Sequence, residues 1–143
     1  MSQIGPSPAK TANAQVNPTQ ALGWDVFVTP GIPIVTRDLP PGVTQAYFQA
    51  MASTLIYGMR DAVLVDAFMT VKQANALADW VAGRGTNLTT IYITHGHGDH
   101  WFGAGTVLER FPNAKAVATP NVVAAAPRSG SRCVIPSVPG GWC

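Results

Sequence analysis

The sequence is poor in charged residues and in cysteine. Only 11% of its 143 residues are Asp, Glu, Lys or Arg, well below the roughly 25% of an average soluble domain. The nine Lys and Arg residues are scattered and the formal net charge is +2, so we expect no nucleic-acid partner, which would need clustered basic side chains. Two cysteines, Cys133 and Cys143, are too few for a disulfide framework. Because 47% of the residues are hydrophobic, the chain can bury a core and does not have the composition of a disordered chain.

Long apolar runs are also lacking. No segment approaches the roughly 18 consecutive apolar residues of a membrane helix, so we expect no membrane partner. Residues 1–22 are rich in Ala, Asn, Gln and Pro and contain no apolar signal-peptide core. We therefore expect a flexible N-terminal extension over 1–22 and a cytoplasmic protein.

Strand patterns dominate the first half of the remaining chain. A hairpin is predicted where a four-residue turn at 58–61 separates two apolar runs. Pro30 and Gly31 predict a turn between the first two strands, and residues 45–52 fit a helix or a strand. The expected strands are 24–29, 32–36, 53–57, 62–66, 88–94 and 114–119.

The best helix pattern begins after Thr70. Thr70 and Gln73 have the spacing of a capping box, and Gly83 is expected to end the helix as a left-handed C-cap. One apolar face is predicted from Val71, Ala74, Leu77, Trp80 and Val81. Shorter helices are expected over 103–111 and from Pro120, which follows Thr119 as the cap.

Residues 127–143 differ in character from the rest. Six of these seventeen residues are Pro or Gly, and the periodic pattern stops. We interpret the segment as an irregular tail that a frameshift or a truncated gene would produce, with an ordinary flexible tail as the alternative. Reading the source DNA in the other two frames separates these hypotheses.

The three histidines of the chain all lie in one short segment directly after an apolar strand. The segment reads His95-Gly96-His97-Gly98-Asp99-His100. Glycines let the backbone fold tightly enough to bring neighbouring side chains together. Imidazole and carboxylate donors suit zinc, and they also suit iron or manganese. The alternative is an exposed polar loop, but it gives no reason for gathering these donors, so the segment predicts metal binding.

The same segment carries a family resemblance. Residues 94–100, THGHGDH, follow an apolar strand, and upstream lie a hairpin ending in Asp66 (VLVDA) and a helix. This arrangement resembles the His-x-His-x-Asp-His motif of the metallo-β-lactamase-fold hydrolase superfamily over about 24–126. The resemblance implies an α+β fold, a four-layer αββα sandwich of two mixed sheets between helices, with only the N-terminal half present over 23–126.

The resemblance also implies roles for individual residues. His95 and His97 would bind one metal ion, and Asp99 and His100 a second, so the intact domain would hold two zinc ions, with iron or manganese as alternatives. Asp66 would support the ligands from behind, although Ala67 stands where the family usually has glycine. With His100 present, the motif is more similar to binuclear hydrolases such as glyoxalase II and lactonases than to lactamases with another residue there.

The implied reaction is hydrolysis of a small ester, thioester, lactone or amide by a metal-bound hydroxide, which Asp99 would also orient. The alternatives are an iron-dependent member of the fold similar to persulfide dioxygenases, and an inactive fragment. Trp101 and Phe102 could line the pocket mouth, but core packing is the favoured interpretation.

Further ligands that the family needs are missing from the sequence. No His follows His100 and no Asp follows Asp99; Glu109 is too close in sequence, and Cys133 or Cys143 could serve only in principle. We therefore expect a half-built site with weak metal binding and little activity. A missing second sheet predicts exposed apolar surface and self-association.

Overall fold

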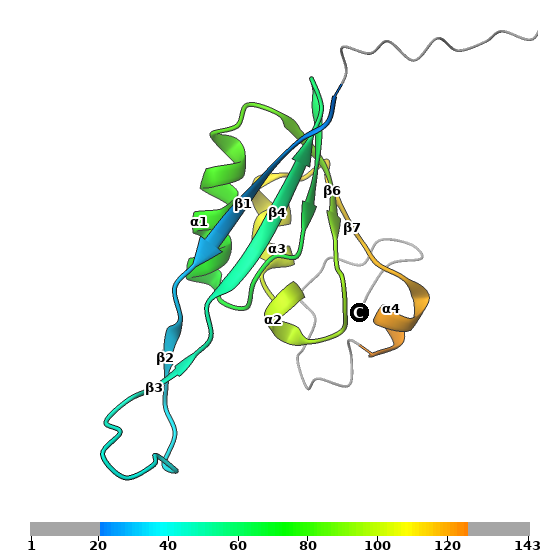
Figure 1. Ribbon diagram of the computed structural model, residues 1–143. Coiled ribbons are helices and arrows are strands. Elements are labelled where there is room, and N and C mark those ends of the chain that lie inside the picture. The colour runs from blue at the N-terminus through cyan, green and yellow to red at the C-terminus, as the bar shows by residue number, and fades with distance from the viewer. Residues whose placement is uncertain (1–20, 126–143) are drawn as a thin grey trace, which may run out of the picture.

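The computed structural model describes residues 21–125 (Figure 1). The expected tail over 127–143, with Cys133 and Cys143, lies outside the described residues, as does most of the expected N-terminal extension. The elements are β1 Gly23–Thr29, β2 Ile32–Ile34, β3 Ala46–Phe48, β4 Met51–Tyr57, β5 Asp61–Val65, α1 Val71–Ala82, β6 Asn87–Tyr92, α2 Gly98–Trp101, α3 Ala104–Arg110, β7 Lys115–Val117 and α4 Pro120–Ala125.

A five-stranded mixed sheet forms the centre of the fold, in the order β1-β4-β5-β6-β7. The predicted hairpin is confirmed: β4 and β5 are antiparallel, and the Gly58 N–H donates to the Asp61 carbonyl at 2.9 Å across the turn. After β5 the chain crosses over through α1, so that β5, β6 and β7 run parallel. Their carboxyl ends therefore meet at one edge of the sheet, the place where open α/β sheets bind ligands.

One face of the sheet is buried beneath helices. Leu55, Leu64 and Ile91 occupy paired positions on β4, β5 and β6, and all three are fully buried. Figure 1 shows α1 and α3 on this side of the sheet, and the core includes Leu77 of α1 and Val107 of α3. Each such side chain contributes about 1.5–3 kcal/mol when it is removed from water.

The opposite face of the sheet is apolar and exposed. Val26, Val65, Tyr92 and Val117 lie in one row across the sheet, and Val26 and Val117 are 44% and 38% exposed. Within residues 21–125, Val26, Tyr92 and Val117 each stay at least 36% exposed, as expected where a second large sheet does not cover this face. Self-association through the exposed face remains a prediction. No helix in the same range is long and apolar enough to cross a bilayer.

Helix α1 begins and ends where predicted, but the conformation of its C-cap differs. The capping box is confirmed, because Gln73 N–H donates to Thr70 Oγ1 and Thr70 N–H donates to Gln73 Oε1, each at 3.2 Å. The left-handed C-cap at Gly83 is wrong: its φ is −64°, and Gly85 is the glycine with a left-handed φ of +69°. The last turn continues through bonds from Arg84 and Gly85 to carbonyls three residues back, which moves the reversal two residues onward.

The turn predicted at Pro30 and Gly31 is also wrong. The chain runs on from β1 into β2, and β2 pairs with β3 in a separate two-stranded sheet (Figure 1). Pro30 lacks the N–H that a continuous strand would donate, so it divides the strand without reversing it. Residues 46–48 are a strand, β3, which settles the ambiguity over 45–52, and β2 ends at Ile34 rather than at Thr36.

Gly103, just before α3, packs closely against α1 and against the segment that follows β5. Gly103 N–H donates to the Phe68 carbonyl at 3.0 Å. A Cβ at Gly103 would lie 2.8 Å from the Ala74 Cβ and would also press on the Ala67 carbonyl oxygen. The backbones of these segments therefore approach too closely for any side chain at position 103.

We predict that Gly103→Ala destabilises the fold by about 1–3 kcal/mol, the usual cost of overpacking, as measured by urea denaturation. Gly83→Ala is the matched control, because its φ is helical and the nearest atoms to an added Cβ are at 3.5 Å. That variant should keep or slightly raise the free energy of unfolding. Equal stability of Gly103→Ala and the wild type would contradict the close approach.

Candidate metal centre

The predicted ligand segment lies at the carboxyl edge of the parallel strands. Val65, at the end of β5, is paired with Tyr92, at the end of β6. Asp66 follows β5 directly, and Thr94 and His95 follow β6. The short helix α2 carries Asp99 and His100, so two loops from neighbouring strands bring these side chains to one place.

Asp66 has an unusual backbone conformation. Its φ is +63°, and Phe68 has a φ of +64°, a region that is uncommon for residues other than glycine and costs of order 1–3 kcal/mol. Hydrogen bonds to the next loop hold the segment: Asp66 N–H donates to the Tyr92 carbonyl at 2.9 Å, and Ala67 N–H donates to the His100 carbonyl at 2.7 Å. Ala67 itself has no left-handed φ, so glycine is not required there.

A buried serine fixes the same segment from the other side. The Ser53 hydroxyl lies 2.9 Å from the carbonyl oxygens of both Val65 and Asp66, and Ser53 is 1% exposed. Our sequence interpretation missed this residue. The signal was its position in β4, where Met51, Ser53 and Leu55 alternate inward and the serine is the polar member.

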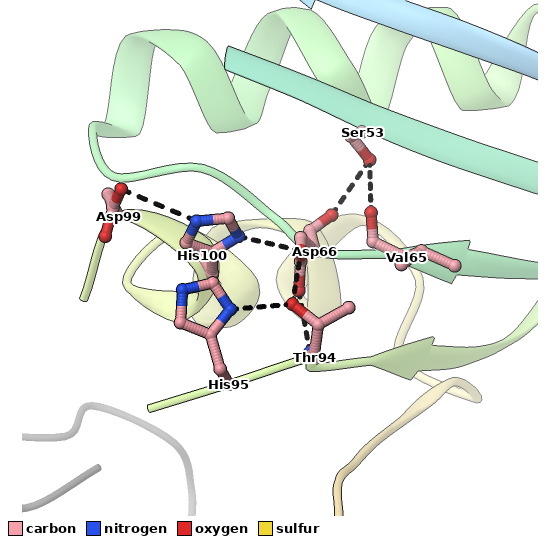
Figure 2. Close-up of polar contacts among 7 residues, drawn as sticks. All are labelled: Ser53, Val65, Asp66, Thr94, His95, Asp99 and His100. Carbon is pink, nitrogen blue, oxygen red and sulfur yellow. Dashed lines mark hydrogen bonds and ion pairs between the residues drawn. The ribbon is translucent and has the colours of Figure 1, made fainter. Parts of the chain in front are cut away.

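The carboxylate of Asp66 is buried beneath the ligand loop and accepts three hydrogen bonds (Figure 2). Its Oδ1 accepts the Thr94 N–H at 2.9 Å, while Oδ2 accepts the Thr94 hydroxyl at 2.8 Å and Nδ1–H of His100 at 2.7 Å. Because an ionised carboxylate only accepts hydrogen bonds, His100 must carry its proton on Nδ1. The other ring nitrogen, Nε2, faces Asp99, whose Oδ2 is 3.5 Å away.

The ring of His95 lies close to those of both other histidines. The ring centroids of His95 and His100 are 3.9 Å apart, and those of His95 and His97 are 4.9 Å apart. Nevertheless, no group of three or more His, Cys, Asp or Glu side chains within residues 21–125 is arranged so that it could hold a metal ion. The loop thus brings its four predicted ligands together as neighbours without completing a site.

Two aromatic residues stabilise the loop from within. Trp101 is 8% exposed, and its Nε1–H donates to the Gly96 carbonyl at 3.2 Å. The ring of Phe102 fills the space where Gly98 would carry a Cβ. Both residues therefore pack inside, which agrees with the favoured interpretation of core packing.

The comparisons with known proteins point to one family. Residues 50–133, more than half of the chain, match the family model of the metallo-beta-lactamase superfamily. No curated protein sequence matches the chain.

Three solved structures of metallo-beta-lactamases resemble the chain. The mono-zinc form of FIM-1 from Pseudomonas aeruginosa aligns with a TM-score of 0.52 and 15% identity, over 71% of this chain and 47% of that one. The enzyme from Erythrobacter litoralis aligns with a TM-score of 0.49 and 24% identity, over 65% and 42%. MIM-2 aligns with a TM-score of 0.45 and 26% identity, over 51% and 28%.

The chain thus spans less than half the length of each of these structures. At 15% identity, the FIM-1 alignment supports the fold alone. The family match covers more than half of the chain, including Asp66 and the whole of the loop at 95–100, and it therefore shows the family as well as the fold. The chain belongs to the metallo-beta-lactamase superfamily.

Proposed function

We propose that residues 95–100 bind zinc as part of the catalytic site of a metal-dependent hydrolase. Its substrate would be a small ester, thioester, lactone or amide. One observation carries the proposal: Asp66 Oδ2 accepts a hydrogen bond from Nδ1–H of His100, and Nε2 of the same ring lies beside the Asp99 carboxylate. Family membership supplies the context for this chemistry.

The contact between Asp66 and His100 is the pattern found behind metal-binding histidines. Such a histidine almost always donates its second ring N–H to a carboxylate, a carbonyl or water, which fixes the ring and raises its basicity. Here the carboxylate is buried and the hydrogen bond is 2.7 Å long. The ring is therefore oriented for a ligand on Nε2 by the protein itself.

The spacing of His100 and Asp99 also fits a shared ion. Two ligands that are each about 2.1 Å from a tetrahedral zinc ion lie about 3.4 Å apart. The distance between His100 Nε2 and Asp99 Oδ2 is 3.5 Å. At that separation the lone pair of His100 Nε2 faces the Asp99 carboxylate without a good hydrogen bond, so a cation between the two groups would stabilise them.

The residue roles in this proposal are those that the family resemblance implies. His95 and His97 would hold one ion, and Asp99 and His100 a second, while Asp99 would also orient the attacking water. Zinc bound here would polarise the substrate carbonyl and activate water for hydrolysis. Asp66 would act without touching the substrate, by orienting His100.

The described part of the chain supplies an incomplete ligand set for either ion. Each ion would therefore need donors from outside residues 21–125. For this reason we expect the chain alone to bind zinc weakly and to turn over little substrate.

Zinc titration of the full chain tests the proposal. We predict that His97→Ala and Asp99→Asn each weaken zinc binding about tenfold or more, at least the effect of removing a supporting residue, as measured by calorimetry or by competition with a chromogenic chelator. Asp79→Asn is the control, since it removes a carboxylate from α1 that is 76% exposed, and it should bind zinc like the wild type. Equal zinc affinities for all four proteins would contradict the proposal. Metal analysis separates the alternative: one iron ion per chain in place of zinc would favour the persulfide-dioxygenase-like member of the fold.

A second prediction concerns Asp66. Asp66→Asn should lower zinc affinity by about 10–100-fold, because one amide oxygen cannot accept all three hydrogen bonds of the carboxylate. Asn tolerates the left-handed φ at this position, so the fold should persist, which thermal unfolding checks. Asp61→Asn, at the opposite end of β5, is the matched control with unchanged affinity. A folded Asp66→Asn chain that binds zinc as tightly as this control would remove the proposed role of Asp66.

A further inference from the structure

The Thr94 hydroxyl connects Asp66 to a second histidine. Thr94 Oγ1 lies 2.8 Å from Asp66 Oδ2 and 2.9 Å from His95 Nδ1. The backbone N–H of Thr94 also donates to Asp66 Oδ1 at 2.9 Å. One carboxylate thus holds Thr94 at two points, and the hydroxyl lies between that carboxylate and the imidazole of His95 (Figure 2).

The number of protons in this chain of hydrogen bonds determines their direction. A threonine hydroxyl has one hydrogen to donate, and an ionised carboxylate has none. The hydroxyl must therefore donate to Asp66 Oδ2, because the opposite arrangement would place two oxygen lone pairs against each other at 2.8 Å. Toward His95 the same oxygen can then only accept, so His95 Nδ1 must be the donor.

A donor at Nδ1 leaves the other ring nitrogen of neutral His95 without a proton. Nε2 of His95 then carries an unprotonated lone pair, as Nε2 of His100 does. In Figure 2 both rings turn one nitrogen toward Asp66 and Thr94 and the other nitrogen away from them. Asp66 therefore determines the proton position on two histidines, directly for His100 and through a hydroxyl for His95.

The Thr94 hydroxyl is held in one orientation, so that Asp66 can determine the tautomer of His95 through it. Thr94 is β-branched, so few χ1 rotamers are open to it. The bond from its N–H to Asp66 Oδ1 fixes the backbone, and the bond from its hydroxyl to Oδ2 selects the rotamer. The acceptor side of Oγ1 is thereby directed at the ring of His95.

We propose that Thr94 is a positioning residue that holds His95 in the Nδ1–H tautomer and so presents Nε2 for metal binding. The metal-binding part rests on the proposed function, whereas the tautomer depends only on the hydrogen bonds of the metal-free chain. A neutral histidine side chain in water favours the opposite, Nε2–H, tautomer. Without Thr94, His95 would have to relocate its proton before it could bind a metal through Nε2.

The test compares Thr94→Val, which keeps the shape and removes the hydroxyl, with Thr94→Ser, which keeps the hydroxyl. Long-range ¹H–¹⁵N spectra of the metal-free, ¹⁵N-labelled full chain at about pH 9, where imidazoles are neutral, report the tautomer of each histidine. We expect the Nδ1–H form at His95 in the wild type and in Thr94→Ser, and a shift toward Nε2–H in Thr94→Val. His100 should keep the Nδ1–H form in all three proteins, because it bonds to Asp66 directly.

Thr90→Val is the matched control, since it makes the same substitution within β6, away from the ligand loop, and should leave both tautomers unchanged. Zinc affinity should fall about tenfold in Thr94→Val and recover in Thr94→Ser. An Nε2–H tautomer at His95 in the wild type would overturn the inference, as would an unchanged tautomer or an unchanged zinc affinity in Thr94→Val. Absence of zinc binding by the wild type would instead overturn the proposed function, while the tautomer result would still decide the role of the hydroxyl.

Discussion

The buried carboxylate of Asp66 is the interaction on which the rest of the site depends. It accepts hydrogen bonds from the backbone and hydroxyl of Thr94 and from His100, and so ties the end of β5 to the loop after β6 and to α2. Burying a charge is unfavourable unless it is paired and hydrogen-bonded, and here both oxygens are satisfied. The positions of the loop and of two imidazoles therefore follow from satisfying one side chain.

Much of the fold could be predicted from the sequence because its signals are local. The Thr70–Gln73 capping box and the 58–61 turn each depend on residues within four positions of one another, and both are confirmed. The turn at Pro30 and the left-handed cap at Gly83 failed because long-range strand pairing and the continuation of the last helical turn outweighed local preference. The four residues of the ligand loop were visible as a motif. Ser53 acts through the antiparallel register of β4 and β5, and Thr94 through the parallel register of β5 and β6, and one sequence reveals neither register.

The exposed sheet face and the unfinished ligand set are related features. The chain spans 47% of the FIM-1 structure that shares its fold, and its sheet buries one face beneath α1 and α3 while Val26 and Val117 remain in solvent on the other. In the same way, the predicted ligands at 95–100 all come from one edge of the sheet. A site built from one side would hold its ligands in place and still need donors from elsewhere to bind an ion tightly.

What the described part does supply is preorganisation. The left-handed backbone at Asp66 would be unfavourable alone, but bonds from Ser53 and to Tyr92 and His100 hold it, and that backbone directs the carboxylate under the loop. The carboxylate then sets the proton on His100, and through Thr94 the proton on His95. Without these hydrogen bonds each imidazole could adopt either tautomer, and moving the proton from Nε2 to Nδ1 would reduce the affinity of that ring for a metal ion. Here the hydrogen bonds formed on folding fix the proton positions, so the orientation of these imidazoles is a property of the fold itself.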